Sequence, residues 1–443
     1  MMAQLKVINP ATQKVIIEIP ISSKKEMLKK VDLAQKTQEK WADFTYQKRA
    51  TYLKKFNQLA KKNKKSIAEI ISKEMGKPIS EALVEVNRAI DNTNWFINNV
   101  EKEIKPKKLQ EQVALLKEPV GVVTAITPWN LPFIIPLWII PPALLTGNTV
   151  VFKPSEISPL TGELIFDLFK KAGLPKGCLN LLIGGDKLGK FLVGSEIDMV
   201  AFVGSQNAGK DIMKNSADKL HKLALELGGK DPLIVLKDTD VKKAAHDAVQ
   251  GSLLNCGQLC ASVERIYVEK QIYNAFVEEV MKEVKSYESI GPLTDPTQLK
   301  IVQSHIRDAK KKGGKILSGG KKRNGKGYFY PPTLIVNVNH SMKLMTEETF
   351  GPIIAIMKVK DEQEAVKFSN CLNYGLCTSI YSKNKKKAKK IASKIQAGTV
   401  CINCTPSSHA AYPWGGVKQS GFGRMLSKQG INEFLEPKVV HMA

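Results

Sequence analysis

The sequence of 443 residues is short of arginine: only six of its 67 basic residues are arginines, although the formal net charge is +25. Proteins that recognise nucleic acid favour the forked guanidinium of arginine. The lysines are also spread along the chain in stretches with helical periodicity, where charge usually serves solvation. We therefore expect no nucleic-acid partner.

No charged-apolar-small leader opens the chain, and the number of cysteines, seven, is odd. Both features favour free thiols in a reducing compartment, so we expect a cytoplasmic protein. The longest apolar stretch, residues 131–145, contains four prolines and is shorter than the ~20 residues that cross a bilayer. We expect this stretch to form a buried wall and the protein to have no membrane role.

Hydrophobic periodicity predicts an α/β protein. Residues 1–20 alternate as in a hairpin or edge strand, and helical stretches follow at 25–40, 48–75 and 80–103, the last two separated by Gly76-Lys77-Pro78. From residue 120, β-type runs at 122–126, 149–152, 179–183, 199–202 and 223–225 alternate with helical patterns such as 159–171 and 207–214. This alternation indicates a parallel sheet, with ligands at the carboxyl ends of its strands.

A second alternating series predicts a second α/β unit. It begins at residues 232–236 and continues through helical patterns at 241–253, 271–285, 300–312, 361–368 and 385–395. Residues 107–117 could pair with the tail from residue 426, as an arm outside both units.

Three residues are candidates for the chemistry. Cys260 lies in a loop of glycine and small residues, where a thiol can be a nucleophile or simply a small hydrophobic core residue. Glu226 ends an apolar run before two glycines, which suits either a general base of raised pKa or a solvent-facing turn. Asn130, in Thr127-Pro128-Trp129-Asn130, could donate to an oxyanion or belong to an ordinary turn.

The cofactor-type elements are weaker. Gly204 and Gly209 have the spacing G-x-x-x-x-G, so the usual dinucleotide fingerprint is absent, yet a Gly-Ser turn that opens a helix can bind a phosphate. The pair Cys401 and Cys404 has no second C-x-x-C partner, and the six histidines are scattered. We therefore expect no metal site.

Seven motifs between residues 127 and 424 occur in one order: TPWNLP, KPSE, FVGS, LELGGK, GQLC, EETFGP and PWGGVKQSGFGR. Together they resemble the NAD(P)-dependent aldehyde dehydrogenase superfamily, and the length is similar to that of the short bacterial semialdehyde dehydrogenases. The resemblance implies two α/β domains with parallel sheets plus a small oligomerisation arm. The implied parts are an NAD-binding domain (1–106 and 121–228), a catalytic domain (229–424) and the arm (107–120 and 425–443) of a homodimer or homotetramer.

The resemblance also implies roles for individual residues. Cys260 matches the nucleophile, Glu226 the general base, and Asn130 the oxyanion donor, which acts together with the backbone N–H of Cys260. Matches to cofactor-binding positions are Thr127, Pro128, Trp129, Lys153, Glu156, Gly204, Ser205, Gly209, Leu227, Glu348 and Phe350. Because the Glu156 carboxylate would bond the adenosine ribose and repel a 2′-phosphate, we expect NAD, with NADP as the second option.

The expected reaction is oxidation of an aldehyde to a carboxylic acid through a cysteine thiohemiacetal and thioester. Water is the expected acyl acceptor, because members that use coenzyme A tend to lack the glutamate that Glu226 matches. Trp138 stands where the semialdehyde dehydrogenases have a carboxylate-binding arginine. The predicted pocket is otherwise apolar, with Ser407, Ser408 and His409 as the only polar candidates beside Leu131, Ile134, Ile135, Trp138, Leu259 and Trp414.

These residues favour a neutral, moderately apolar aldehyde as substrate. The alternatives are a succinate-semialdehyde dehydrogenase that uses NAD or NADP and, outside the enzymes, an inactive structural homologue.

Overall fold

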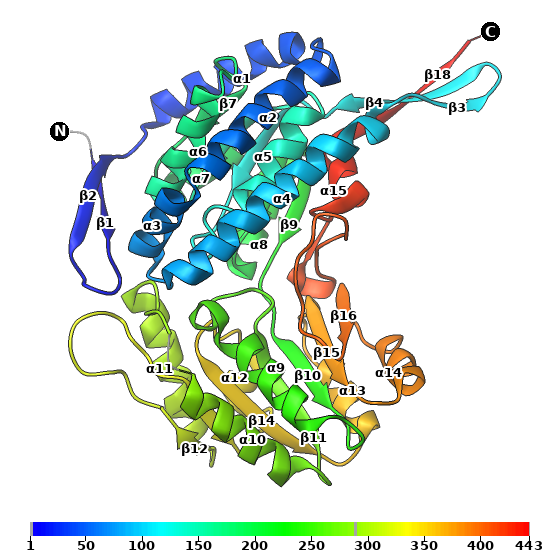
Figure 1. Cartoon of the computed structure of the whole chain (residues 1–443). Helices are drawn as coiled ribbons and strands as arrows, with labels where there is room; N and C mark the ends of the chain where they lie inside the picture. Colours follow the sequence, from blue (N-terminus) through cyan, green and yellow to red (C-terminus); the bar gives the residue numbers. More distant parts are fainter. Residues whose placement is uncertain (1–2, 288–289, 443) are drawn as a thin grey trace.

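Two sheets organise the chain, one in each of two stacked α/β units (Figure 1). The computed structural model describes residues 3–287 and 290–442. None of the described helices is long and apolar enough to cross a bilayer. All seven cysteines are free thiols.

The sheet of the first unit has five parallel strands in the order β9-β8-β5-β6-β7, and the short β17 (Gly421–Phe422) pairs antiparallel with β9. The chain runs from β5 outward to β7 and then returns to the other side of β5. The order therefore reverses between β5 and β8, where the loops diverge and leave a crevice for a ligand. The strands are β5 (Val122–Ile126), β6 (Thr149–Lys153), β7 (Leu179–Leu181), β8 (Met199–Val203) and β9 (Lys222–Glu226).

Successive side chains of these strands point to opposite faces of the sheet. Because these side chains are apolar on both faces, helices cover both. Val122 and Ile126 share a core with the helices α1, α7 and α8, whereas Val123 and Ala125 face the larger core formed by α2 to α6. The helices are α1 (Lys24–Ala42), α2 (Tyr46–Lys62), α3 (Lys64–Met75), α4 (Ile79–Ile104), α5 (Pro136–Leu145), α6 (Pro159–Lys171), α7 (Asp186–Val193) and α8 (Gln206–Ser216). Every residue of α5 is buried, as expected of a wall.

One helix boundary differs from the sequence prediction. The stretch 48–75 was expected to be a single helical stretch, but it forms α2 and α3 with Asn63 between them. The Asn63 side-chain amide and backbone N–H both donate to the carbonyl of Leu59, and α2 ends just before Asn63, at Lys62. An asparagine at this position competes with the helical backbone and allows the change of direction.

The second unit is built on a sheet in the order β12-β13-β14-β11-β10-β15-β16, parallel except for the edge strand β12. Its strands are β10 (Asp231–Val235), β11 (Val263–Glu269), β12 (Lys315–Ser318), β13 (Thr333–Val336), β14 (Ile353–Val359), β15 (Cys377–Tyr381) and β16 (Thr399–Ile402). Its helices are α9 (Val241–Leu253), α10 (Tyr273–Ser286), α11 (Pro296–Lys311), α12 (Lys343–Thr346), α13 (Glu362–Asn370) and α14 (Lys385–Ala392).

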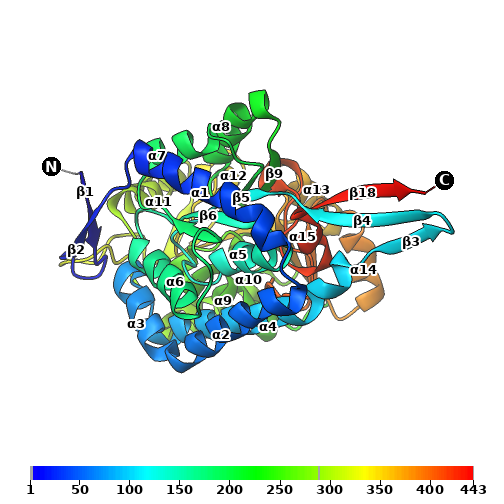
Figure 2. The same ribbon diagram turned by 90° about the horizontal axis from the view of Figure 1, so that it is seen from above.

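Two smaller elements project from opposite sides of the molecule (Figure 2). One is the hairpin of β1 (Gln4–Ile8) and β2 (Val15–Pro20). The other is a three-stranded sheet of β3 (Lys107–Gln110), β4 (Val113–Pro119) and β18 (Leu435–His441), reached through α15 (Ser427–Glu433). The predicted pairing between the segment near residue 110 and the tail is confirmed, since β4 and β18 run antiparallel along their whole length.

Candidate active site

The loop that carries Cys260 is strained. After α9, three consecutive residues, Asn255, Cys256 and Gly257, have φ angles of 55°, 59° and 68°. Left-handed backbone at non-glycine residues costs about 1–3 kcal/mol each and persists only where surrounding contacts impose it. One such contact is the Asn255 N–H, which donates to the carboxylate of Glu81 on α4 at 2.9 Å.

Asn130 follows β5 in the first unit and is hydrogen-bonded to this loop in the second. Its side-chain Nδ2 donates to the carbonyl of Gln258 at 2.9 Å, and its own carbonyl accepts from Nδ2 of Asn255 at 3.0 Å. Nδ2 carries a second hydrogen, and in the described part of the chain the backbone N–H of Cys260 has no acceptor. Two donors are thus available beside one thiol, as an oxyanion requires.

A buried ion pair holds Asn130 in place from the other side. Lys77 Nζ lies 2.7 Å from the Glu85 carboxylate, both side chains are 2% exposed, and Lys77 also donates to the carbonyl of Asn130 at 2.9 Å. The second oxygen of Glu85 accepts from the backbone N–H groups of Phe133 and Ile134. Sequence reasoning interpreted Lys77 only as part of a break between helices.

Glu226, the last residue of β9, is buried, and neither carboxylate oxygen has a hydrogen-bond partner in the described residues. Burial raises its pKa well above the ordinary value; the Glu433 carboxylate adds to this, and Arg424 opposes it. Burial, together with the carboxylates of Asp231, Glu226 and Glu348, also raises the pKa of the Cys260 thiol. Burial thus favours the uncharged forms of both the Cys260 thiol and the Glu226 carboxyl.

The two glycines after Leu227 are required by close backbone approaches. A Cβ at Gly228 would clash with the Glu348 carboxylate, and one at Gly229 would clash with the carbonyl of Cys260. The segment between β9 and β10 therefore brings the nucleophile loop and the loop of Glu348 against the same stretch of backbone.

Three cavities meet around these groups. The central cavity, of about 260 Å³, is lined by Asn130, Glu226, Cys260, Glu348 and others from both units. The strand-end cavity, of about 430 Å³, extends it along the carboxyl ends of β5, β6 and β8, and Ser205 lines both. A third cavity, of about 290 Å³ and lined along one side by residues of α4, is called the α4 cavity; Cys260 and Trp414 line both it and the central cavity.

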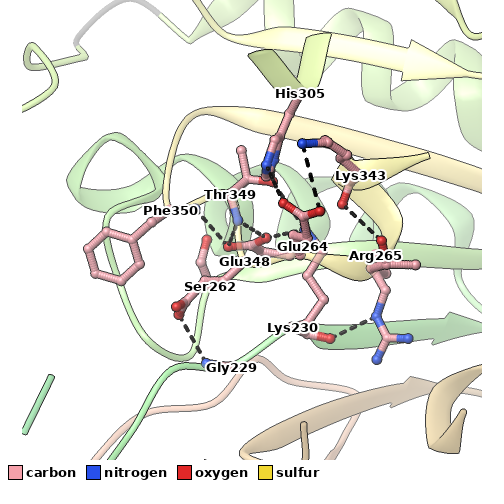
Figure 3. Close-up of polar contacts among 12 residues, drawn as sticks. Gly229, Lys230, Ser262, Glu264, Arg265, His305, Lys343, Glu348, Thr349 and Phe350 are labelled. Carbon is pink, nitrogen blue, oxygen red and sulfur yellow. Dashed lines mark hydrogen bonds and ion pairs between the residues drawn. The ribbon is translucent and has the colours of Figure 1, made fainter. Parts of the chain in front are cut away.

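The loop of Glu348 and Phe350 rests on a buried charge cluster (Figure 3). The Lys230 ammonium pairs with the carboxylate of Glu264, which accepts from the backbone N–H groups of Thr349 and Phe350. Phe350 is thereby held at a φ of 51°, with its ring edge-to-face against Trp129 at 5.5 Å.

Glu348 itself accepts from the backbone N–H of Gly229 at 3.0 Å. Burial and repulsion by Glu264 raise its pKa to about 8, against the opposing effects of Gly229 and Lys230. Glu348 lines the central cavity, and its second carboxylate oxygen makes no hydrogen bond within the described residues, so a hydroxyl ligand can donate to it.

The strand-end cavity combines a helix N-terminus with a charged pair. Ser205 caps α8 by accepting from the Ala208 N–H at 3.3 Å, and the first turn packs closely on β9 because Gly209 has no side chain to meet Leu227. Lys153 lines this cavity and lies 3.7 Å from Glu156. Free N–H groups at a helix N-terminus favour a phosphate.

The structure brings most of the predicted residues to these cavities. The central cavity is lined by Pro128, Trp129, Gly204, Ser205, Leu227, Glu348 and Phe350, and the α4 cavity by Leu131, Ile134, Trp138, Leu259 and Trp414. Thr127, Glu156 and Gly209 are not among the lining residues of the three cavities; the Thr127 N–H donates to the carbonyl of Lys153. Ile135 needs correction, because it lines the central cavity and not the α4 cavity with its neighbours.

The expectation of a pocket with only three polar candidates was also wrong. Ser407 and Ser408 do line the α4 cavity, but α4 and the residues just before it add Lys77, Ser80, Glu81, Glu85 and Arg88. The spacing of the charged members, roughly every fourth residue, places them on one helix face. This signal was present in the sequence within a stretch interpreted only as a helix.

The whole chain matches a known family. The model of the aldehyde dehydrogenase family covers residues 2–440. The chain belongs to the aldehyde dehydrogenase family.

Three relatives match nearly the whole chain at similar sequence identity. A Sinorhizobium fredii protein named "Probable succinate-semialdehyde dehydrogenase [NADP(+)]" is 35% identical over 98% of this chain and 92% of its own. A solved lactaldehyde dehydrogenase has a TM-score of 0.97 at 34% identity, covering 99% of this chain and 96% of that one. A point mutant of Staphylococcus aureus betaine aldehyde dehydrogenase, solved in complex with NAD+, has a TM-score of 0.95 at 34% identity, with coverages of 99% and 94%.

The unpartnered Glu226 carboxylate gives a prediction for stability. Its folded pKa lies above the ordinary 4.5, so ionisation in the unfolded chain alone lowers the stability of the wild type as the pH rises from 4.5 toward the folded pKa. Glu226→Gln cannot ionise. Its free energy of unfolding relative to the wild type should therefore increase as the pH rises above about 5, as measured by urea denaturation.

The control for this measurement is Glu69→Gln at an exposed position of α3. The difference in free energy of unfolding between this variant and the wild type should not change with pH. If the difference in free energy of unfolding between Glu226→Gln and the wild type also stays constant with pH, this carboxylate is solvated in the native state.

Proposed function

We propose that this protein oxidises an aldehyde to a carboxylic acid with NAD, through a thioester on Cys260 that water hydrolyses. The single observation that supports this proposal best is the position of Cys260 at the junction of two cavities, with Asn130 bonded to its loop and Glu226 unpartnered in the wall. An inactive homologue would not need to retain a buried, unpartnered carboxylate there, which costs stability.

In the first step the Cys260 sulfur adds to the aldehyde carbonyl carbon, and the thiol proton passes to solvent. The carbonyl oxygen becomes an oxyanion that accepts from the free hydrogen of Asn130 Nδ2 and from the Cys260 N–H. Preorganised donors of this kind are worth about 100- to 1000-fold in rate each. The product of this step is a thiohemiacetal.

The residues around the central and strand-end cavities fit a nicotinamide dinucleotide. The N-terminus of α8, at the switch point of the sheet, suits the pyrophosphate; Lys153 and Glu156 suit the adenosine ribose, and Glu348 the second ribose. A nicotinamide held there would supply the hydride acceptor for oxidation of the thiohemiacetal to a thioester. Phe350 and Trp129 would pack beside it and exclude water.

Glu226 then activates the water that attacks the thioester. A carboxylate of raised pKa is a stronger base than an ordinary one, and with no hydrogen-bond partner its oxygens are free to bind water. Attack releases the carboxylic acid and restores the Cys260 thiol. The presence of this base favours water over coenzyme A as the acyl acceptor.

The two α/β units would have different roles in the reaction. Residues 1–106 and 121–228 would bind the cofactor, and residues 229–424 would carry the nucleophile. The sheet of β3, β4 and β18 exposes Leu109, Val439 and Val440, so we propose residues 107–120 and 425–443 as the arm through which subunits associate.

The proposal predicts separable half-reactions. Glu226→Gln should release close to one equivalent of NADH per active site on first exposure to an oxidisable aldehyde and NAD, after which steady-state turnover should fall roughly 100- to 10,000-fold. Rapid-mixing absorbance measurements of NADH check this. Cys260→Ala should give neither phase, and a Glu226→Gln enzyme with unchanged steady-state turnover would contradict the assigned role.

A second prediction concerns the cofactor. Since the Glu156 carboxylate would repel a 2′-phosphate, Glu156→Gln should lower the ratio of kcat/KM for NAD to that for NADP by about tenfold or more. The matched control is Glu163→Gln on α6, outside the three cavities. An unchanged ratio for Glu156→Gln would place cofactor discrimination elsewhere.

A further inference from the structure

The α4 cavity contains more charge than a pocket for an apolar aldehyde needs. Lys77, Glu81, Glu85 and Arg88 all line it, opposite the apolar Trp138 and Trp414. Charged groups are costly to bury unless they are paired or bind a ligand. The partners of each group therefore show which one is free to bind a substrate.

Three of the four charges are already committed. Lys77 and Glu85 neutralise each other, and Glu85 also accepts two backbone N–H groups. Glu81 accepts from Asn255, and burial raises its pKa, which disfavours its charged form. None of these three has a free charge to offer a substrate.

Arg88 differs from them. Its Nη2 donates to the Ser407 hydroxyl at 2.8 Å, to the Ser408 carbonyl at 2.5 Å and to the Ser408 hydroxyl at 3.2 Å. Nε and Nη1 make no hydrogen bond or ion pair within residues 3–287 and 290–442. Burial lowers the pKa of Arg88, with Glu85 opposing, but a guanidinium keeps its proton.

Other donors accompany this guanidinium. The indole N–H of Trp138 is buried without an acceptor in the described residues and belongs to the same cavity. The hydroxyl groups of Ser407 and Ser408 accept from Arg88 and can turn their own hydrogens toward a ligand. A cavity with several donors and one uncommitted positive charge suits a ligand rich in acceptors.

We infer that Arg88 is a specificity-determining residue that binds the carboxylate of an aldehyde carrying an acid group at its far end. Because Nη2 is occupied by the serines, Nε and Nη1 are the groups that can each donate a charge-assisted hydrogen bond to the carboxylate. The inference rests on the proposed oxidation at Cys260 and names its substrate class. It replaces the expectation of a neutral aldehyde, which depended on an apolar pocket.

The cavity limits the size of the substrate. Cys260 and Arg88 line the same cavity of about 290 Å³. The aldehyde and the carboxylate are then separated by a short spacer of methylene groups, which the faces of Trp138 and Trp414 can cover. Their ring centroids are 6.0 Å apart.

The test compares 4-oxobutanoate with its methyl ester, which has nearly the same shape and no charge. The wild type should prefer the acid in kcat/KM. In Arg88→Gln, kcat/KM for the acid should fall about 10- to 150-fold, mainly through KM, because a charged hydrogen bond is lost. The value for the ester should change by less than about threefold, and Arg88→Lys should recover part of the loss.

Val84→Ala is the matched control, since Val84 lines the same cavity on the same helix. It should change the acid and the ester by the same factor, as a change in packing alone does. Equal losses for the two substrates in Arg88→Gln, or no preference for the acid in the wild type, would overturn the assignment to Arg88.

A binding measurement separates this inference from the proposed reaction. Calorimetry should show that butanedioate, the product of 4-oxobutanoate, binds the wild type at least about tenfold more tightly than Arg88→Gln. If no aldehyde is oxidised, the proposed reaction fails, whereas equal binding to both proteins would refute the role of Arg88.

Discussion

The reciprocal hydrogen bonds between Asn130 and the loop of residues 255–260 are the constraint on which the rest of the structure depends. They join a loop of the first α/β unit to the Cys260 loop of the second, and so fix Asn130, the proposed oxyanion donor, relative to Cys260. The buried pair of Lys77 and Glu85 supports them from α4. Removing one member of such a pair costs about 3–5 kcal/mol, because the other charge is left buried alone.

The electrostatics of the site follow from its position between the units. Burial makes the Glu226 and Glu348 carboxylates more basic and the Cys260 thiol less acidic than in water. The charged form of each group is disfavoured in the free protein, and in the proposed reaction each gains a partner from substrate, water or cofactor. The site is therefore prepared for ligands at a cost that the cores of the two units offset.

The sequence predicted the fold and the three residues proposed for the chemistry for different reasons. Alternating β-type runs and amphipathic helices are local patterns, so both sheets and the pairing of β4 with β18 were predictable. Cys260, Glu226 and Asn130 lie in short motifs of unusual composition. Arg88 carries no such signal, because an arginine on an amphipathic helix is ordinary and only packing turns it toward a cavity.

The break at Asn63 and the position of Ile135 were missed because both depend on local direction rather than on hydrophobic pattern. A hydrogen bond from a side chain to the preceding turn ends α2. The short segment before α5 turns Ile135 to the opposite side of the chain from Ile134, into a different cavity.

The most direct test of the central claim is intact-mass and peptide mass spectrometry of Glu226→Gln after mixing with an oxidisable aldehyde and NAD. We predict an adduct equal to the aldehyde less two hydrogens on Cys260; an adduct on Cys256 instead, or none at all, would contradict the account.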